Sequence, residues 1–75
     1  MDISVSEFMS AMVHKVNALV AANDRRTKPW TRKDFIIYIQ GACDWFKFVS
    51  GEDFDAEAVT SNIYIESDVI NEIKD

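Results

Sequence analysis

The sequence predicts an all-α domain: a small helical bundle of two long antiparallel helices plus one or two shorter C-terminal helices. Two helix-start motifs, two apolar stripes of helical period and the lack of a second strand-like segment support this class. With 75 residues, the chain forms a single helical domain over 1–75. Because 48% of its residues are hydrophobic, we expect either an unusually dense core or some apolar surface kept for a partner.

The first predicted helix begins at a capping box, Ser4-Val5-Ser6-Glu7. In such a box the serine hydroxyl accepts from the N–H of the glutamate, whose side chain accepts in return from the serine N–H. An apolar stripe of helical period follows, made of Val5, Phe8, Met9, Met12, Val16, Leu19 and Val20. Asn23 and Asp24 are expected to end this helix.

The second predicted helix runs from about Arg32 to Ser50, between a capping box at Thr31 and Asp34 and a C-terminal glycine, Gly51. Its core face is expected to contain Phe35, Tyr38, Ile39, Ala42, Trp45, Phe46 and Val49. The polar side also carries Ile37, Gly41 and Phe48. Glycine inside a helix costs about 1 kcal/mol relative to alanine, so we expect another helix to approach Gly41 closely.

The last third of the chain predicts less regular structure. Asp53 or Asp55 is expected to cap a third helix over about 55–61, followed by an irregular joint and a short helix capped by Ser67. The joint is expected because Thr60-Ser61-Asn62 has poor helix propensity and Ile63-Tyr64-Ile65 is rich in strand formers. A lone strand would have no partner within this chain.

Charge is sorted along the sequence. Residues 34–75 hold ten of the thirteen acids, and the net charge is −5. Five of the eight bases lie within 25–33, namely Arg25, Arg26, Lys28, Arg32 and Lys33. A basic spot on an acidic body steers partners without determining the fold.

The basic loop 25–33 allows two interpretations. It is a candidate nucleic-acid or phosphate site, because an anion can bind a helix N-terminus and Trp30 can stack on a base. Alternatively, the bases pair with acids of this chain or of a partner protein while Trp30 packs on the core. The net charge of −5 opposes docking on DNA. A helix-turn-helix is disfavoured because the linker is about eight residues long and the third element is acidic.

No catalytic or metal site and no cofactor is predicted. The only histidine, His14, lies on the polar side of the first helix and lacks companions for a zinc site or a triad. Cys43 is expected to be a small buried hydrophobe. The acidic run from Asp53 has the initial spacing of a calcium loop, but Ala58 and Tyr64 occupy the positions that require glycine and glutamate. We therefore do not expect an enzyme.

The expected location is the cytoplasm. A single cysteine excludes an internal disulfide, which a small secreted domain would usually have. The amino end lacks the basic segment of a signal peptide. The longest apolar run, residues 35–39, is far short of the roughly 20 residues of a membrane span.

The leading functional hypothesis is a small acidic intracellular protein–protein interaction module. It would be an inhibitor or adaptor of the kind that small phage or mobile-element genes encode, binding another protein or itself as a homodimer. The candidate protein-binding residues are Trp30, Ile37, Gly41, Asp44 and Phe48. Nucleic-acid or phosphate binding by the basic loop is the first alternative. The second is mimicry of nucleic acid by the acidic C-terminal part, whose simpler interpretation is an ordinary solvated face.

Overall fold

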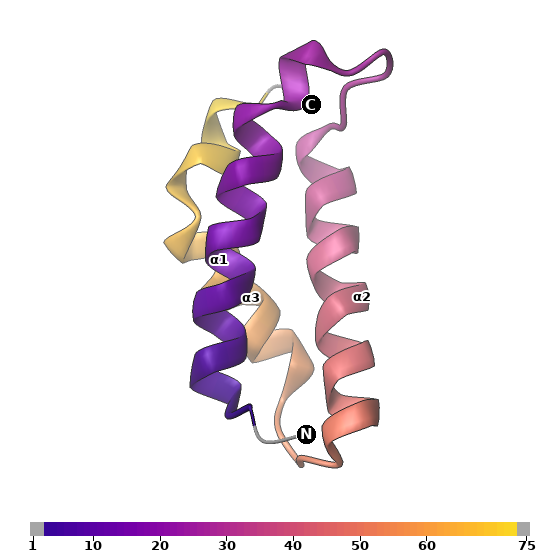
Figure 1. The fold of residues 1–75 in the computed structure, drawn as a ribbon, viewed down its shortest axis with the longest axis vertical. Helices are drawn as coiled ribbons and strands as arrows, with labels where there is room; N and C mark the ends of the chain where they lie inside the picture. Colours follow the sequence, from indigo (N-terminus) through magenta and orange to yellow (C-terminus); the bar gives the residue numbers. More distant parts are fainter. Residues whose placement is uncertain (1–2, 74–75) are drawn as a thin grey trace.

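The computed structural model describes residues 3–73, and every regular element in this range is helical (Figure 1). The prediction of an all-α chain is confirmed for these residues. The elements are α1 (Val5–Ala21), the 3₁₀ turn η1 (Asn23–Arg25), α2 (Arg32–Ser50), α3 (Ala56–Glu66) and the 3₁₀ helix η2 (Asp68–Glu72). The molecule is elongated, with extents of 36 × 20 × 19 Å.

The third helix links the two long ones. In Figure 1 the chain rises along α1 and descends along α2, with the loop 51–55 leading to α3 behind them. The backbone of α3 lies close to both α2 and α1, and η2 packs against all three helices. One side of α2 therefore faces the bundle, while no element of residues 3–73 lies over its opposite side.

Both capping boxes form as the sequence predicts. The Ser4 hydroxyl accepts from the backbone N–H of Glu7 at 3.1 Å, and the Glu7 carboxylate accepts from the N–H of Ser4 at 3.3 Å. At the start of α2, the Thr31 hydroxyl accepts from the N–H of Asp34 at 3.3 Å, and Asp34 accepts in return at 2.9 Å. Gly51 ends α2 with a φ of 70°, a left-handed conformation that glycine adopts without strain.

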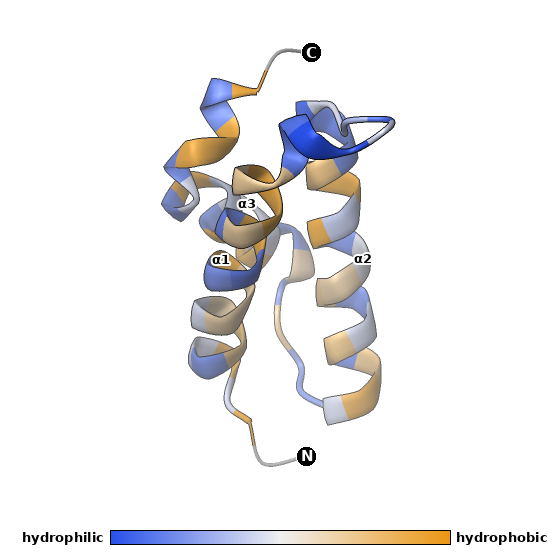
Figure 2. Ribbon diagram, turned by 45° about the horizontal axis from the view of Figure 1, so that its top comes forward, coloured by the Kyte–Doolittle hydropathy of each residue, from blue (hydrophilic) through white to orange (hydrophobic). Residues whose placement is uncertain are grey.

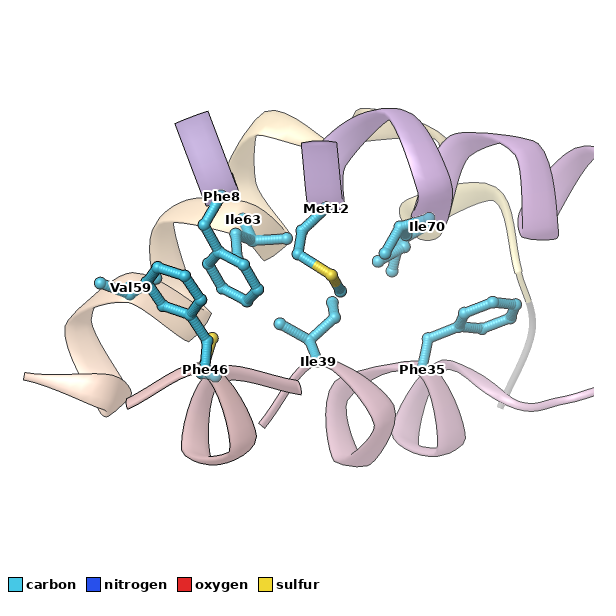
Figure 3. Close-up of a cluster of buried hydrophobic side chains, with 10 residues drawn as sticks. Phe8, Met12, Phe35, Ile39, Phe46, Val59, Ile63 and Ile70 are labelled. Atoms are coloured by element: carbon cyan, nitrogen blue, oxygen red, sulfur yellow. The ribbon is translucent and has the colours of Figure 1, made fainter. Parts of the chain in front are cut away.

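The core fills the space between the long helices (Figure 3). The Phe8 ring from α1 stacks on the Phe46 ring from α2, with centroids 4.3 Å apart and planes inclined by 9°. The buried hydrophobic residues are Phe8, Met12, Val16, Phe35, Ile39, Cys43, Phe46, Val59, Ile63 and Ile70. Four of the five elements, α1, α2, α3 and η2, contribute to this cluster, so the described residues share one core.

The predicted joint in the last third lies elsewhere. The third helix does not stop near residue 61 but continues to Glu66. Burial of Ile63 stabilises the longer helix. The Thr60 hydroxyl donates to the Ala56 carbonyl at 2.7 Å, so its hydrogen bond is formed within the helix. The cap of α3 is Asp55, which accepts from two backbone N–H groups at 3.0 and 3.2 Å.

Ser67 is the joint residue and does not cap the next element with its side chain. The element that follows, η2, is a 3₁₀ helix without a side-chain cap bond. The Ser67 hydroxyl oxygen is buried and has no hydrogen-bond partner within the described range.

Two residues expected in the core are exposed. Trp45 and Val49, predicted on the core face of α2, are 56% and 38% exposed. Both lie at the edge of the apolar arc, whereas Phe46 lies at its centre. The remaining elements are too few to cover an arc this wide, so its edge is left in solvent.

Candidate functional site

The outward side of α2 carries a row of exposed apolar side chains. Ile37 is 55% exposed, Trp45 is 56% exposed and Phe48 is 86% exposed. Gly41 is also exposed and lies between Ile37 and Trp45. Spacings of four, four and three residues place these side chains on one face of a helix. We call Ile37, Gly41, Trp45 and Phe48 the α2 ridge.

The structure brings together four of the five residues predicted to bind protein. Ile37, Gly41 and Phe48 form the ridge, and exposed Asp44 lies at its edge. Trp30 lies apart from them, before the N-terminus of α2. It is half-buried, and its ring packs on Phe35 at 4.9 Å between centroids. The Trp30 ring therefore covers one end of the core.

Trp45 is a surface residue that the sequence pattern assigned to the core. Its position four residues after Gly41 was the available signal, because residues at this spacing share a face. The apolar arc of α2 was too wide for the pattern to show which edge would be covered.

Gly41 has no neighbour that explains it. A Cβ placed there would have no atom of the described chain within 4 Å, apart from the local helix backbone. The helix expected to approach Gly41 is therefore not found among residues 3–73. An alanine would therefore fit at this position, and packing among residues 3–73 does not require the glycine.

We expect Gly41→Ala to stabilise the isolated domain by about 1 kcal/mol, because alanine restricts the unfolded chain and favours helix. For a chain of this size that corresponds to a rise in Tm of roughly 4–8 °C. Thermal unfolding followed by circular dichroism at low protein concentration measures the change. A Tm that is unchanged or lowered would show that an atom of the chain does crowd this position.

A shallow groove separates α2 from α3 beside the ridge. It is lined by Ile36, Gln40, Asp44, Ala56, Glu57, Thr60, Ser61, Tyr64 and Ile65. Asp44 belongs to both the groove and the edge of the ridge. Asp44 and Glu57 make one end of the groove acidic, whereas Ile65, which is 64% exposed, makes the other end apolar.

The bases of the loop 25–33 are of two kinds: four are exposed to solvent, and Arg32 is bonded to the protein. Figure 2 shows a strongly hydrophilic segment where the chain leaves α1 and bends towards α2. Arg32, in contrast, is half-buried, and its guanidinium donates to the carbonyls of Asn71 at 3.2 Å and Ile73 at 2.9 Å. The other four bases, Arg25, Arg26, Lys28 and Lys33, are exposed and form no ion pair with carboxylates of the described residues. These four bases therefore do not pair with the acids of residues 3–73.

The surroundings of Trp30 disfavour stacking on a nucleic-acid base. The Arg26 guanidinium lies 4.7 Å from the centre of the Trp30 ring, and Tyr38 packs on the ring at 5.6 Å between centroids. An incoming base would have to displace Arg26. The Asp34 carboxylate already occupies the N-terminus of α2, where a phosphate would otherwise bind.

Asn23 has a structural role that its sequence position did not reveal. It is 7% exposed, and its side-chain amide bridges the backbone of Trp30. The Nδ2 group donates to the Trp30 carbonyl at 2.9 Å, and Oδ1 accepts from the Trp30 N–H at 2.9 Å. The sequence marked Asn23 only as a helix end, because nothing in it identifies a partner seven residues away.

The single cysteine is buried beneath α3. Burial raises the pKa of the Cys43 thiol above its ordinary value of 9.0; a hydrogen bond with Thr60 lowers it, and the Asp44 carboxylate raises it. The thiol is therefore kept neutral in the folded protein. This environment opposes the thiolate, which is the nucleophilic form of cysteine.

Ionisation of the Cys43 thiol should lower the free energy of unfolding at alkaline pH. The folded state holds its thiol proton to higher pH than the unfolded state, so this contribution is complete below pH 9.0 and is lost as the pH rises through the folded pKa. Urea unfolding at about pH 8 and about pH 10 should show a larger loss for the natural protein than for Cys43→Ala. Equal losses in the two proteins would contradict the raised pKa.

Within 3–73, no group of three or more His, Cys, Asp and Glu side chains is placed to hold a metal ion. No helix in this range has both the length and the apolar character that crossing a membrane requires.

Comparison with protein families, curated proteins and solved structures found no match. Function is therefore inferred from the geometry of this chain alone.

Proposed function

We propose that this chain is a small acidic protein-interaction module, an inhibitor or adaptor, that binds a partner protein through the α2 ridge. The observation that supports the proposal is the 86% exposure of Phe48, with Trp45 and Ile37 also more than half exposed on the same face. Large exposed apolar patches mark interaction sites in soluble proteins. Tryptophan is also enriched among the residues that dominate binding energy.

The proposed site is on a rigid support. In this proposal α1 and α2 act as an antiparallel pair whose inner faces are fixed by the core. Phe46, two residues before Phe48, is 1% exposed and stacks on Phe8. The ridge is thus attached to a helix whose other side cannot move without disrupting the core. A preorganised face loses little conformational entropy on binding.

Capture of partners from an extract of the source cells tests the proposal. The tagged protein is compared with Phe48→Glu and Trp45→Glu, which place a charge on the ridge, and with Ala18→Glu, which makes the same charge change at an exposed position of α1. We expect a protein that is retained by the natural chain and by Ala18→Glu and is lost with both ridge variants. Circular dichroism of each variant verifies the fold.

Nuclease treatment of the extract separates this proposal from nucleic-acid binding by the basic loop. Capture that survives nuclease and depends on the ridge supports a protein partner. Retention that is insensitive to both ridge variants, or that disappears with nuclease, contradicts the proposal. In the second case the variant Arg25→Ala, combined with Lys28→Ala, should abolish retention, because phosphate contacts would supply most of the affinity.

A further inference from the structure

We infer that the α2 ridge binds a second copy of this chain, with the two α2 helices packed side by side in opposite directions. The inference rests on the proposed function and names the partner. It follows from the position of charges at the two ends of α2, from the spacing of the ridge, and from the open space at Gly41. Each of these observations fits an antiparallel copy.

The two ends of α2 carry opposite charge. Exposed bases of the loop and the first turn lie at its N-terminus, whereas exposed acids follow its C-terminus. The basic end consists of Arg25, Arg26, Lys28 and Lys33, and the acidic end consists of Glu52, Asp53, Asp55 and Glu57. These ends lie at opposite extremes of α2 in Figure 1 and form no ion pairs with each other. The 19 residues of α2 separate them by about 28 Å, so they cannot meet within one chain.

An antiparallel second copy brings unlike charges together at both ends. When Phe48 of one copy faces Ile37 of the other, the same register places Lys33 of each copy beside Glu52 of the other. A two-fold axis outside the ridge, level with residues 42 and 43 along α2, relates the two contacts, as in an isologous dimer. A parallel copy would instead place Lys33 beside Lys33, which repels. The charge distribution therefore selects the antiparallel arrangement.

The apolar part of the ridge has the size that such an interface needs. Aromatic side chains present about 150–250 Å² each, so Trp45 and Phe48 at 56% and 86% exposure offer about 300 Å² together. Ile37 adds to this area. A standard interface buries about 800 Å² per partner, of which somewhat more than half is apolar. The ridge supplies most of that apolar share.

Gly41 completes the arrangement. It lies near the level of the proposed two-fold axis, and apart from its chain neighbours and the local helix backbone no atom of residues 3–73 lies within 4 Å of the place that a Cβ would take. Glycine allows two backbones to approach closely. In the dimer, the Trp45 ring of the second copy occupies the space above Gly41. Within each copy, Trp45 lies about one helical turn after Gly41 on the same face of α2.

Sedimentation equilibrium over about 1–500 μM protein provides the first test. The monomer mass is 8.6 kDa, and we expect the natural chain to approach twice this value with increasing concentration. Phe48→Glu should weaken association at least about a hundredfold, because it buries an unpaired charge against Ile37 in each of the two symmetry-related apolar contacts. Ala18→Glu, at an exposed position of α1, should associate like the natural chain.

Charge reversal tests the direction of packing. Lys33→Glu and Glu52→Lys should each weaken self-association about tenfold, because each creates two repulsive contacts. An equimolar mixture of the two variants should associate like the natural chain, since both contacts in the mixed dimer are then attractive. Lys15→Glu on α1 is the matched control and should have no effect. The reversed residues are exposed, so the variants are expected to fold, and circular dichroism verifies this.

The outcomes separate this inference from the proposed function. A natural chain that stays monomeric up to 500 μM, or a dimer insensitive to Phe48→Glu, overturns the second-copy inference. A mixture of the two charge variants that associates no better than each alone overturns the antiparallel arrangement. If the chain is monomeric and yet captures a protein in a ridge-dependent manner, the second copy is wrong and the proposed function stands. If ridge-dependent capture also fails, both are wrong.

Discussion

Replacing Phe46 by alanine is expected to leave most of the protein unfolded at 25 °C. The Phe46 side chain is 1% exposed, stacks on Phe8 and contacts the Phe54 ring at 5.9 Å between centroids. Truncating a buried phenylalanine costs about 3–5 kcal/mol. A chain of this size rarely has more than about 3–5 kcal/mol of stability from its core. The loss is therefore comparable to the whole stability of the domain.

Phe48 is the matched control for this prediction because it is the same residue type on the same helix. It is 86% exposed, so Phe48→Ala should change the free energy of unfolding by less than about 0.5 kcal/mol. Far-ultraviolet circular dichroism and urea titration at low micromolar concentration compare the two variants. A folded Phe46→Ala with a midpoint near that of the natural protein would mean that the Phe8–Phe46 contact does not hold the long helices together.

The helix boundaries were predictable because local chemistry determines them. Ser4 with Glu7 and Thr31 with Asp34 are short motifs whose hydrogen bonds form within four residues. Gly51 ends α2 for an equally local reason, its left-handed backbone. Such interactions do not depend on what the helix packs against, so they can be derived from the sequence. The start and end of α2 were located to the residue in this way.

The position of the ridge was only partly predictable, because exposure depends on tertiary packing. Ile37 and Phe48 fall on the polar side of the helical pattern, which was enough to identify them. Trp45 and Val49 lie at the edge of the apolar arc, where the pattern cannot show which neighbour covers them. The structure leaves both in solvent, since α1 and α3 face the other side of α2.

Helix propensity wrongly predicted that the third helix would end near residue 61, whereas it ends at Glu66. The run Thr60-Ser61-Asn62 disfavours helix locally, but Val59 and Ile63 are buried on the same side of α3. Core burial of two aliphatic side chains, at about 1.5–3 kcal/mol each, outweighs the few tenths of a kcal/mol lost to propensity at each polar residue. The helix therefore continues until Ser67.

Asn23→Ala is expected to destabilise the protein by about 2–4 kcal/mol, although it removes only a small polar side chain at the start of η1. Its amide pairs with both the N–H and the C=O of Trp30 at 2.9 Å. Removal leaves two polar groups without their partners, and each unsatisfied buried group costs about 1–3 kcal/mol. Part of the loss is recovered where water reaches the half-buried Trp30.

The effect should extend beyond the hydrogen bonds, because Asn23 fixes the loop that positions Trp30 on Phe35 and leads into α2. We expect the Tm of Asn23→Ala to fall by roughly 10–20 °C. Asn23→Asp should recover only part of the loss: Oδ1 can still accept from the Trp30 N–H, but the donor to the Trp30 carbonyl is gone and a carboxylate now faces that oxygen. Asn62→Ala, at an exposed position of α3, is the control and should cost less than about 0.5 kcal/mol. If Asn23→Ala matches this control, the loop is held by Trp30 packing and the amide bridge contributes little.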